Sequence, residues 1–353
     1  MQLFLKNSWY CAGWSSKLSD KPQGIKILGE DIVLFRTSDG TPAALNGRCP
    51  HRFAPLSIGC VKGDVIECGY HGLQFDRNGT CTLNPHGEGT IPPRAHTTAY
   101  QVEEHDGAVW IWMGQPGAGD PKSIMDLYFM GGKPGWEAAT GYLKINSDYR
   151  LVIDNLLDLT HGTYLHPTTV AVSAEHSLGA LLKYDFRTEG NVVHSNYTFL
   201  NSPPTALFRP FCGQDRYDIY AFMRWEPAGS LLLDISTTGV GEPKGTGVMM
   251  PSCHLIVPET EKSCHYFWAI ARNVELDDRE KTRAMQEAVA YAFEVEDEPV
   301  IEACQKMMNG QEFFDLEPAI LSTDVAGIQA RRILNKLIAH GAERSSVGEE
   351  RII

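Results

Sequence analysis

Two cysteine–histidine pairs lie close together near the start of this sequence of 353 residues. Cys49 and His51 flank a proline, and Cys68 and His71 follow after a gap of 16 residues. Two thiolates and two imidazoles can bind a metal, and a structural zinc site would accept all four. Zinc sites, however, usually pair cysteine with cysteine and histidine with histidine. One of each per segment instead favours a [2Fe–2S] cluster with both thiolates on one iron and both imidazoles on the other.

A second set of polar residues belongs to a segment whose apolar periodicity predicts a helix over 148–166. The helix must end near His166, because Pro167 disfavours helical backbone for the residue before it. Positions 154, 158 and 161 are spaced as i, i+4 and i+7, so they are expected to share one face. This is either a solvated polar face or part of a metal site, in which the chain turns and brings His166 back toward His161. The polar residues are Asp154, Asn155, Asp158, His161 and His166.

Two histidines and one carboxylate form the facial triad of non-haem Fe(II) oxygenases, which leaves coordination positions open for O2. The carboxylate must come from elsewhere in the chain. Most acidic residues of one later stretch are expected to face solvent, and Asp297 is also placed to cap the segment after Pro299. A helix break at Pro299 would give Asp297 room to point inward. The acidic residues of this stretch are Glu294, Glu296, Asp297, Glu298 and Glu302.

The elements that must position these residues divide into two parts. Up to residue 113 the sequence has short apolar or alternating runs, such as 31–35 and 108–113, separated by Gly, Asn and Asp turns. This pattern predicts a β-rich domain. The Gly- and Pro-rich run 114–121 is the best candidate linker. Beyond it, further strands and long helical patterns predict an α+β domain.

Two long helices are predicted in the second part. One begins at Asp277, whose spacing to Glu280 resembles a capping box, and continues to about residue 308 with a break at Pro299. The other spans about 324–339 and ends before Gly341. We therefore expect an α+β protein with a first domain over 1–120, a second over 121–341 and a frayed polar tail over 342–353.

The composition excludes several classes of protein. Hydrophobic residues make up 43% and charged residues 21%, and the net charge of −13 argues against nucleic-acid or anionic-membrane binding. No apolar run approaches the roughly 18 residues that cross a bilayer, and the N-terminal residues do not form a secretory signal. Nine cysteines without a leader favour thiols or metal ligands over disulfides, and the cytoplasm as the compartment.

Both metal motifs, with their flanks, resemble one family. Cys49-Pro50-His51-Arg52, Cys68-Gly69-Tyr70-His71-Gly72 and Asn155-x2-Asp158-x2-His161-x4-His166 are similar to the motifs of Rieske non-haem iron monooxygenases, oxygenase component. Within that group the chain looks most like the branch of vanillate O-demethylase, dicamba O-demethylase and toluenesulfonate methyl-monooxygenase. The resemblance implies an all-β Rieske domain followed by a catalytic domain with an antiparallel sheet and helices, of the helix-grip kind.

The resemblance also assigns cofactors and roles to residues. It implies a Rieske [2Fe–2S] cluster on Cys49, His51, Cys68 and His71, with O2 as the cosubstrate. It implies mononuclear Fe(II) on His161, His166 and Asp297. Members of this branch are typically homotrimers, in which the cluster of one chain faces the iron of its neighbour. By that resemblance Asp158, grouped with Asn155 as catalytic, would bridge His71 of one chain to His161 of the next.

The implied function is O2-dependent O-demethylation of a methoxylated aromatic acid. Electrons would come from NAD(P)H through a flavin and iron–sulfur reductase or a ferredoxin. The alternative is hydroxylation of an aryl methyl group or ring carbon by the same centres. His254 lies where dicamba-demethylase-like members have a substrate-contacting histidine, although it is equally readable as a core histidine. Arg209 is a candidate for neutralising the substrate's acid group, or else a surface residue.

Two alternative hypotheses assign the chain to other classes of protein. A stand-alone Rieske electron carrier with a binding domain would not need the second His, His and Asp site. A zinc-stabilised regulatory protein would be colourless, whereas a Rieske protein is red-brown.

Overall fold

The computed structural model describes residues 3–166, 168–170 and 182–349. The chain divides into two compact units, Phe4–Asp126 and Met1–Leu3 with Leu127–Ile353. Both units contain antiparallel sheets, and α-helices occur only in the second among the described residues. The expected α+β class is therefore confirmed. No helix of the described part is long and apolar enough to cross a membrane.

The unit Phe4–Asp126 is built from three small antiparallel sheets, ordered β1-β11-β10, β2-β3-β4-β9 and β5-β6-β7-β8. The predicted strands at 31–35 and 108–113 are present as β3 and β11, and both are mostly buried. The strands are β1 (Trp9–Trp14), β2 (Gln23–Ile27), β3 (Glu30–Arg36), β4 (Pro42–Asn46), β5 (Cys60–Lys62), β6 (Val65–Glu67), β7 (Gln74–Asp76), β8 (Cys81–Leu83), β9 (Ala99–Tyr100), β10 (Val102–His105) and β11 (Ala108–Trp112).

The loops that carry the cysteine–histidine pairs rest on one apolar core. Phe35, Leu45 and Phe75 are fully buried in it, and the side chains of Cys49 and Cys68 belong to the same cluster. Burial of such side chains is the main source of stability in a small β domain. Because both loops are anchored in this core through Cys49 and Cys68, the core fixes them relative to each other.

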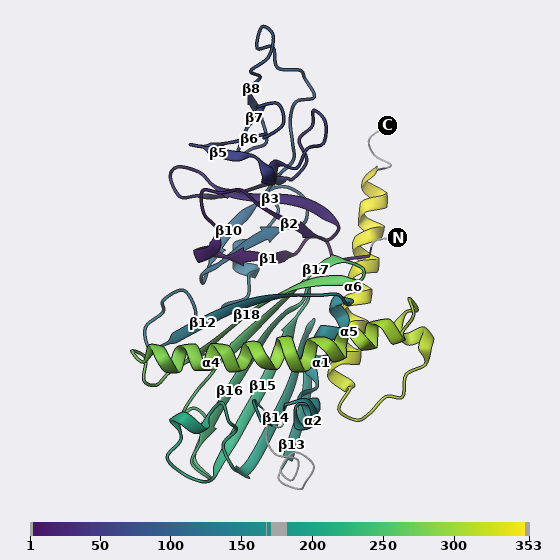
Figure 1. Cartoon of the computed structure of the whole chain (residues 1–353). Helices are drawn as coiled ribbons and strands as arrows, with labels where there is room; N and C mark the ends of the chain where they lie inside the picture. The colour runs from purple at the N-terminus through teal and green to yellow at the C-terminus, as the bar shows by residue number, and fades with distance from the viewer. Residues whose placement is uncertain (1–2, 167, 171–181, 350–353) are drawn as a thin grey trace. The chain divides into compact units, whose positions relative to one another are not determined.

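The second unit is organised around a seven-stranded antiparallel sheet, ordered β12-β18-β17-β16-β15-β14-β13 (Figure 1). Alternate residues of β14 and much of β15 are buried, as a half-covered sheet requires, whereas nearly all residues of β17 and β18 are buried. Gly141 of β12 pairs with Trp268 of β18, and a side chain at 141 would collide with the indole ring at 2.1 Å. The strands are β12 (Glu137–Ile145), β13 (Leu182–Glu189), β14 (Val192–Ser202), β15 (Tyr217–Glu226), β16 (Ser230–Thr238), β17 (Ser252–Thr260) and β18 (Ser263–Arg272).

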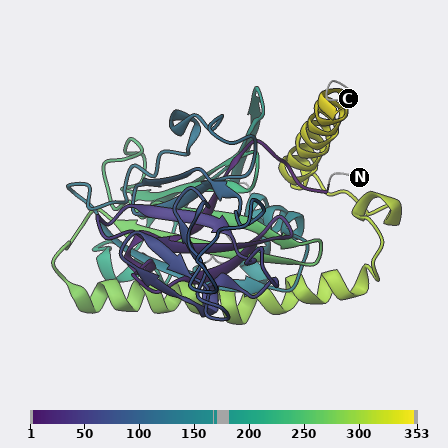
Figure 2. The same ribbon diagram turned by 90° about the horizontal axis from the view of Figure 1, so that it is seen from above.

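Helices cover one face of this sheet. Figures 1 and 2 show α4, a π-helical turn and α5 as one nearly continuous rod that crosses the strands. The shorter α1 contacts α5, α6 and strands β15 and β17. The helices are α1 (Tyr149–Leu157), α2 (Gly162–Leu165), α4 (Arg279–Tyr291), the π-helix Ala292–Asp297, α5 (Glu298–Met307) and α6 (Val325–Glu349).

Three helix predictions differ from the structure. The segment 148–166 is not one helix, because Asp158 has extended backbone (φ −115°, ψ 93°) and ends α1. The break near Pro299 is a π-helical turn that precedes the proline, which itself occupies the first turn of α5, where proline is tolerated. The last helix continues through Gly341 to Glu349, so the expected end there is wrong.

Candidate metal centres

The two cysteine–histidine segments form a matched pair of tight loops. In the first, Cys49 N–H donates to Ala54 O and Phe53 N–H donates to Cys49 O, both at 2.9 Å. The second repeats the pattern, with Gly72 N–H donating to Cys68 O at 2.9 Å. The residue four after each cysteine has left-handed backbone, φ +59° at Phe53 and +69° at Gly72. Such backbone is costly for phenylalanine, so the surrounding structure must hold the first loop in place.

The thiols and imidazoles of these loops are segregated by depth. Cys49 and Cys68 are buried, with 1% and 2% of their surface exposed, and they lie within hydrogen-bonding range of each other. The rings of His51 and His71 lie nearer the surface, with their centroids 4.5 Å apart. His86, which the sequence did not single out, contacts His71 O through Nε2 at 2.8 Å. The loops thus bring the two predicted thiol ligands close to each other and the two predicted imidazole ligands close to each other.

The donor set fits an iron–sulfur cluster. Burial beside Cys68 raises the pKa of Cys49 to about 11, because two adjacent thiols are hard to ionise in an apolar core. Bound iron would supply the positive charge that stabilises both as thiolates. Two thiolates below and two imidazoles above match the division of ligands that a Rieske cluster makes between its two irons.

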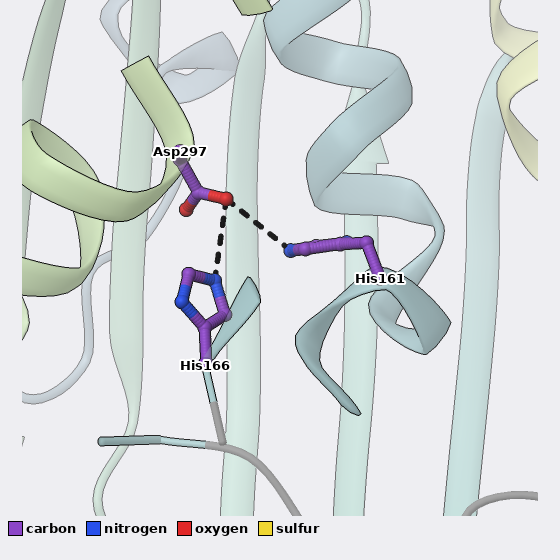
Figure 3. A group of neighbouring side chains, drawn as sticks. All are labelled: His161, His166 and Asp297. Carbon is purple, nitrogen blue, oxygen red and sulfur yellow. Dashed lines mark ion pairs between the residues drawn. The ribbon is translucent and has the colours of Figure 1, made fainter. Parts of the chain in front are cut away.

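A second group of ligand-type atoms lies in the Leu127–Ile353 unit (Figure 3). His161 Nε2 is 3.5 Å and His166 Nε2 is 3.2 Å from the same atom, Asp297 Oδ1. All three ligand atoms lie within 4.8 Å of one another, and Asp297 and His166 are buried. Two imidazoles and one carboxylate are the ligand set of a facial triad.

The two histidines converge because the chain turns twice after α1. Asp158 ends α1, and the 3-10 turn Leu159–His161 and the single-turn helix α2 follow. His166 then leaves helical geometry (φ −116°, ψ 41°) while its N–H still donates to Gly162 O at 2.7 Å. The expectation that residues 154, 158 and 161 share one helix face is therefore wrong, whereas the return of His166 toward His161 is present.

The π-helical turn places the carboxylate. Ala292–Asp297 contains one residue more per turn than an α-helix, and such turns often occur at functional sites. Asp297 makes no side-chain cap to α5, so the alternative role as a helix cap is not the one adopted. Its Oδ1 instead accepts a hydrogen bond from Asn155 Nδ2 at 3.2 Å. Asn155 thus orients the carboxylate from α1.

Each histidine is held by a different kind of acceptor. His161 Nδ1 lies 2.5 Å from the backbone oxygen of Asp158, and His166 Nδ1 lies 2.8 Å from Glu296 Oε2. These contacts favour a proton on Nδ1 and leave both Nε2 atoms for a metal. Sequence analysis missed Glu296, which was grouped with solvated acids, although only 13% of its side chain is exposed.

The charge around His166 also fits a cation. Burial lowers the pKa of His166, but the hydrogen bonds and charges of Asp297 and Glu296 raise it by more, so its pKa is raised overall. Two carboxylates around one buried imidazole attract positive charge, which a divalent iron would provide in place of a proton. The residues present therefore fit the implied metal.

The Asp158 carboxylate makes its contacts within the chain. Its Oδ1 accepts from Thr160 N–H at 2.9 Å and from Tyr197 O–H at 3.3 Å, and its Oδ2 accepts from Thr323 O–H at 3.0 Å. Thus it caps the turn that carries His161, and the backbone oxygen rather than the carboxylate faces that ring. The bridge between His71 of one chain and His161 of the next stays a prediction about an assembled protein.

One cavity opens onto the His161, His166 and Asp297 group. Its volume is about 130 Å3, close to that of cavities known to hold one benzene ring. The wall is mostly apolar, and beside the metal residues its polar side chains are those of Asn155, Thr163, Thr205, Ser252 and His254. The apolar part is formed by Leu156, Leu159, Val170, Phe199, Leu207, Ile219, Ala221, Met223, Leu233, Ile235, Ala269, Ile270, Val289 and Phe293.

The two predicted substrate contacts are placed differently. His254 is buried on β17 and lines the cavity. Leu207 also lines it, whereas Arg209, two residues later, is exposed on the 3-10 turn Arg209–Phe211. The role of Arg209 as a partner for an acidic substrate stays a prediction. Its exposed position outside the cavity wall does not favour that role. Sequence reasoning missed Ser252, whose single hydroxyl carries no motif.

Comparison with known proteins identifies the family of both parts of the chain. Residues 8–100 match the Rieske [2Fe–2S] domain, and residues 145–340 match the vanillate O-demethylase oxygenase C-terminal domain. The chain is 38% identical to the oxygenase component of chloroacetanilide N-alkylformylase from Rhizorhabdus wittichii, over 95% of this chain and 96% of that one. It is 34% identical to the oxygenase component of dicamba O-demethylase from Stenotrophomonas maltophilia, over 95% and 98%.

The fold matches as well. A crystal structure of dicamba monooxygenase bound to dicamba superposes with a TM-score of 0.89, at 34% identity, covering 96% of this chain and 99% of that one. Family match, identity and fold therefore agree over nearly the whole length. The chain belongs to the oxygenase components of Rieske monooxygenases, enzymes that use a [2Fe–2S] cluster, non-haem iron and O2.

Proposed function

We propose that this protein is the terminal oxygenase of a demethylase system, which removes a methyl group oxidatively from a methoxylated aromatic compound. The observation that carries the proposal is an apolar cavity of one-ring size that ends at His161, His166 and Asp297. A ring held there presents a substituent to the metal side of the cavity. Relatives named as vanillate and dicamba O-demethylases support this choice of reaction.

The geometry supports the proposed metal-binding roles. His161 Nε2, His166 Nε2 and Asp297 Oδ1 would hold Fe(II), and Cys49, Cys68, His51 and His71 would hold the cluster. Bound iron supplies O2 activation once electrons arrive from the cluster.

The protein's own residues position the reactants. The apolar wall excludes water and aligns the ring, so that the methoxy carbon lies beside the iron ligands. Asn155 keeps Asp297 oriented, and Glu296 and the Asp158 backbone oxygen keep the imidazoles turned toward the cavity. Hydroxylation of the methoxy carbon gives a hemiacetal, which breaks down to a phenol and formaldehyde.

The alternative reaction is hydroxylation of an aryl methyl group or a ring carbon at the same site. The same one-ring cavity and the same metal residues would serve either reaction. The product distinguishes the two reactions.

The proposal extends to partners and assembly. An oxygenase component needs an NAD(P)H-dependent reductase or a ferredoxin to deliver electrons. We propose a homotrimer in the cytoplasm, with Asp158 linking the cluster of one chain to the iron of the next. We also propose that the chain works as a Rieske domain over 1–120 and a catalytic domain over 121–341.

A single-turnover assay tests the reaction. Protein reduced with dithionite and desalted is mixed with O2 and a panel of methoxylated and methylated benzenes, and formaldehyde and aromatic products are both quantified. Formaldehyde in equal amount to a phenol is the expected result. A hydroxymethyl or ring-hydroxylated product without formaldehyde would move the enzyme to the alternative. No product with both iron centres loaded would contradict the proposal.

A further inference from the structure

A buried ion pair joins α1 to α6. Arg331 Nε lies 3.0 and 2.8 Å from the two carboxylate oxygens of Asp154, and Arg331 Nη2 lies 2.6 Å from Asp154 Oδ2. Only 4% of Arg331 is exposed, and its guanidinium carbon lies 4.3 Å from the centre of the Phe313 ring. The planar guanidinium group thus fixes both the distance and the orientation of the Asp154 carboxylate.

The two helices approach each other closely beside this pair. A side-chain carbon at Gly327 of α6 would lie 3.0 Å from Asp154 Oδ1, which is tighter than an ordinary contact. Glycine within a helix weakens it relative to alanine. The close approach of α6 to Asp154 therefore accounts for glycine at this position, whereas helix formation does not.

A hydrogen bond ties the segment before α6 to the end of α1. Thr323, two residues before α6 begins, donates its O–H to Asp158 Oδ2 at 3.0 Å. Asp154 and Asp158 are four residues apart, and Asp158 ends the helix. Thr323 and Arg331 therefore hold both ends of the last turn of α1.

The same turn of α1 orients the metal residues. Asn155 follows Asp154, and its Nδ2 donates to Asp297 Oδ1 at 3.2 Å. The Asp158 backbone oxygen lies 2.5 Å from His161 Nδ1. A rotation of α1 by about 20° would move a side-chain tip about 5 Å from the helix axis by roughly 2 Å. A shift of that size would break the hydrogen bond to Asp297.

The position of α1 depends on its neighbours. The helix has nine residues, fewer than the roughly 12–15 at which an isolated helix is marginal in water. A buried ion pair generally adds little stability beyond what apolar side chains of similar size would give. The particular contribution of the Arg331–Asp154 pair is direction, because a guanidinium group binds a carboxylate in a defined geometry.

We infer that Arg331 is a positioning residue for the mononuclear iron site: through Asp154 it holds Asn155 where that side chain orients Asp297. Thr323 supports the same turn of α1 through Asp158. The inference rests on the proposed iron site and does not depend on which reaction occurs there.

Iron binding and fold stability are measured separately on the full-length protein. Mononuclear iron is removed with a chelator, and the Fe(II) affinity is then determined anaerobically by competition with a coloured chelator. Electron paramagnetic resonance of the nitric oxide adduct reports the geometry at the bound Fe(II), and Tm reports the stability of the fold. The visible spectrum of the Rieske cluster is an internal control.

Replacing both members of the ion pair separates position from stability. Arg331→Met combined with Asp154→Leu leaves no buried charge unpaired, so Tm should stay near that of the wild type. Fe(II) affinity should fall about ten-fold, which is the lower end of the effect of groups that orient metal ligands. The nitric oxide signal should broaden, because Asp297 is held less firmly. Arg332→Met is the matched control, since Arg332 is the exposed neighbour on α6, and it should change none of these quantities.

A double-mutant cycle tests the route through Asn155. Asn155→Ala alone should weaken Fe(II) binding roughly 10–100-fold. Replacing the ion pair in the Asn155→Ala protein should cost little further affinity, because both changes remove the same orientation of Asp297. Additive losses would overturn this route.

Each contrary result has a distinct meaning. Wild-type Fe(II) affinity with an unchanged nitric oxide signal in the ion-pair variant would show that Arg331 only stabilises the fold. If that variant does not fold, the comparison is made with Arg331→Lys, which keeps the charge but not the planar group. Weaker Fe(II) binding is expected there, and wild-type values would overturn the inference.

The outcomes also separate this inference from the proposed function. Wild-type protein that binds Fe(II) but forms no formaldehyde in single turnover would leave the role of Arg331 intact and count against demethylation. Wild-type protein that binds no Fe(II) would refute the iron site itself, and the role of Arg331 with it.

Discussion

The two iron-side histidines differ in what holds their outer nitrogen. His161 Nδ1 faces the neutral backbone oxygen of Asp158, whereas His166 Nδ1 faces the Glu296 carboxylate. Thr169 O–H also donates to Glu296 at 2.7 Å, which fixes that carboxylate. A carboxylate makes an imidazole a more basic ligand. His166 is therefore expected to bind iron more strongly than His161.

We expect Glu296→Gln to weaken iron binding roughly 10–100-fold, because the amide keeps the shape of Glu296 but not its charge. The Rieske cluster, on other residues, should keep its visible spectrum. Iron per chain after dialysis against a chelator measures the effect. Glu294→Gln is the control, since Glu294 is exposed on the same π-helical turn. Equal iron retention in both variants would refute the role of Glu296.

At the scale of elements, the π-helical turn decides where Asp297 points. Removing one residue rotates the downstream part of a helix by about 100°, given 3.6 residues per turn. We expect deletion of exposed Val295 to restore an α-helical turn and swing Asp297 away from His161 and His166. The protein should then lose its non-haem iron but keep its Rieske colour and helical circular dichroism.

Val295→Ala serves as the control for this deletion, because it removes most of the side chain and keeps the residue count. It should retain iron. A deletion variant that retains iron with unchanged affinity would show that the extra residue does not orient the carboxylate.

Sequence patterns predicted the class of each part of the chain and several of its elements, but not their irregular joints. Alternation predicted strands of the domain that carries the loops of Cys49 and Cys68, and Pro167 correctly marked where the helical region ends. The break at Asp158 and the π-helical turn were not predicted. Their side chains make hydrogen bonds with distant parts of the chain, from Thr323 to Asp158 and from Asn155 to Asp297, which sequence spacing does not reveal. For the same reason Glu296 looked like one solvated acid among several. Spacing therefore identified candidate ligands, whereas packing alone revealed their supports.

At the scale of the whole molecule, iron and protons compete for the same site. The pKa of His166 is raised above its usual value of 6.5. Without iron, the folded protein therefore favours the protonated imidazole. A group whose pKa is higher in the folded than in the unfolded state stabilises the fold below its ordinary pKa. This stabilisation is lost as the pH rises through the folded-state pKa. Iron-free protein should therefore lose this stabilisation as the pH rises above about 6.5.

Iron-loaded protein should lose less over that range, because the metal replaces the proton. Thermal unfolding of both forms at pH 6, 7 and 8 measures this, and the difference in Tm between loaded and iron-free protein should widen as the pH rises. Parallel curves for the two forms would contradict the expectation. The net charge of −13 affects both forms alike, so it does not enter the comparison.

The helical segments and the sheet contribute different parts of the cavity, and this separation affects how such enzymes diversify. The metal-site residues all come from helical segments and their joints, whereas Ser252, His254 and most of the apolar wall come from the strands. Point mutations in the strands can therefore change what is recognised without disturbing the oxidising centre. Selection for a new substrate can therefore change the strand residues, while the helical segments that hold the metal residues stay the same. Relatives named for chloroacetanilides and for dicamba, at similar identity, accord with this separation.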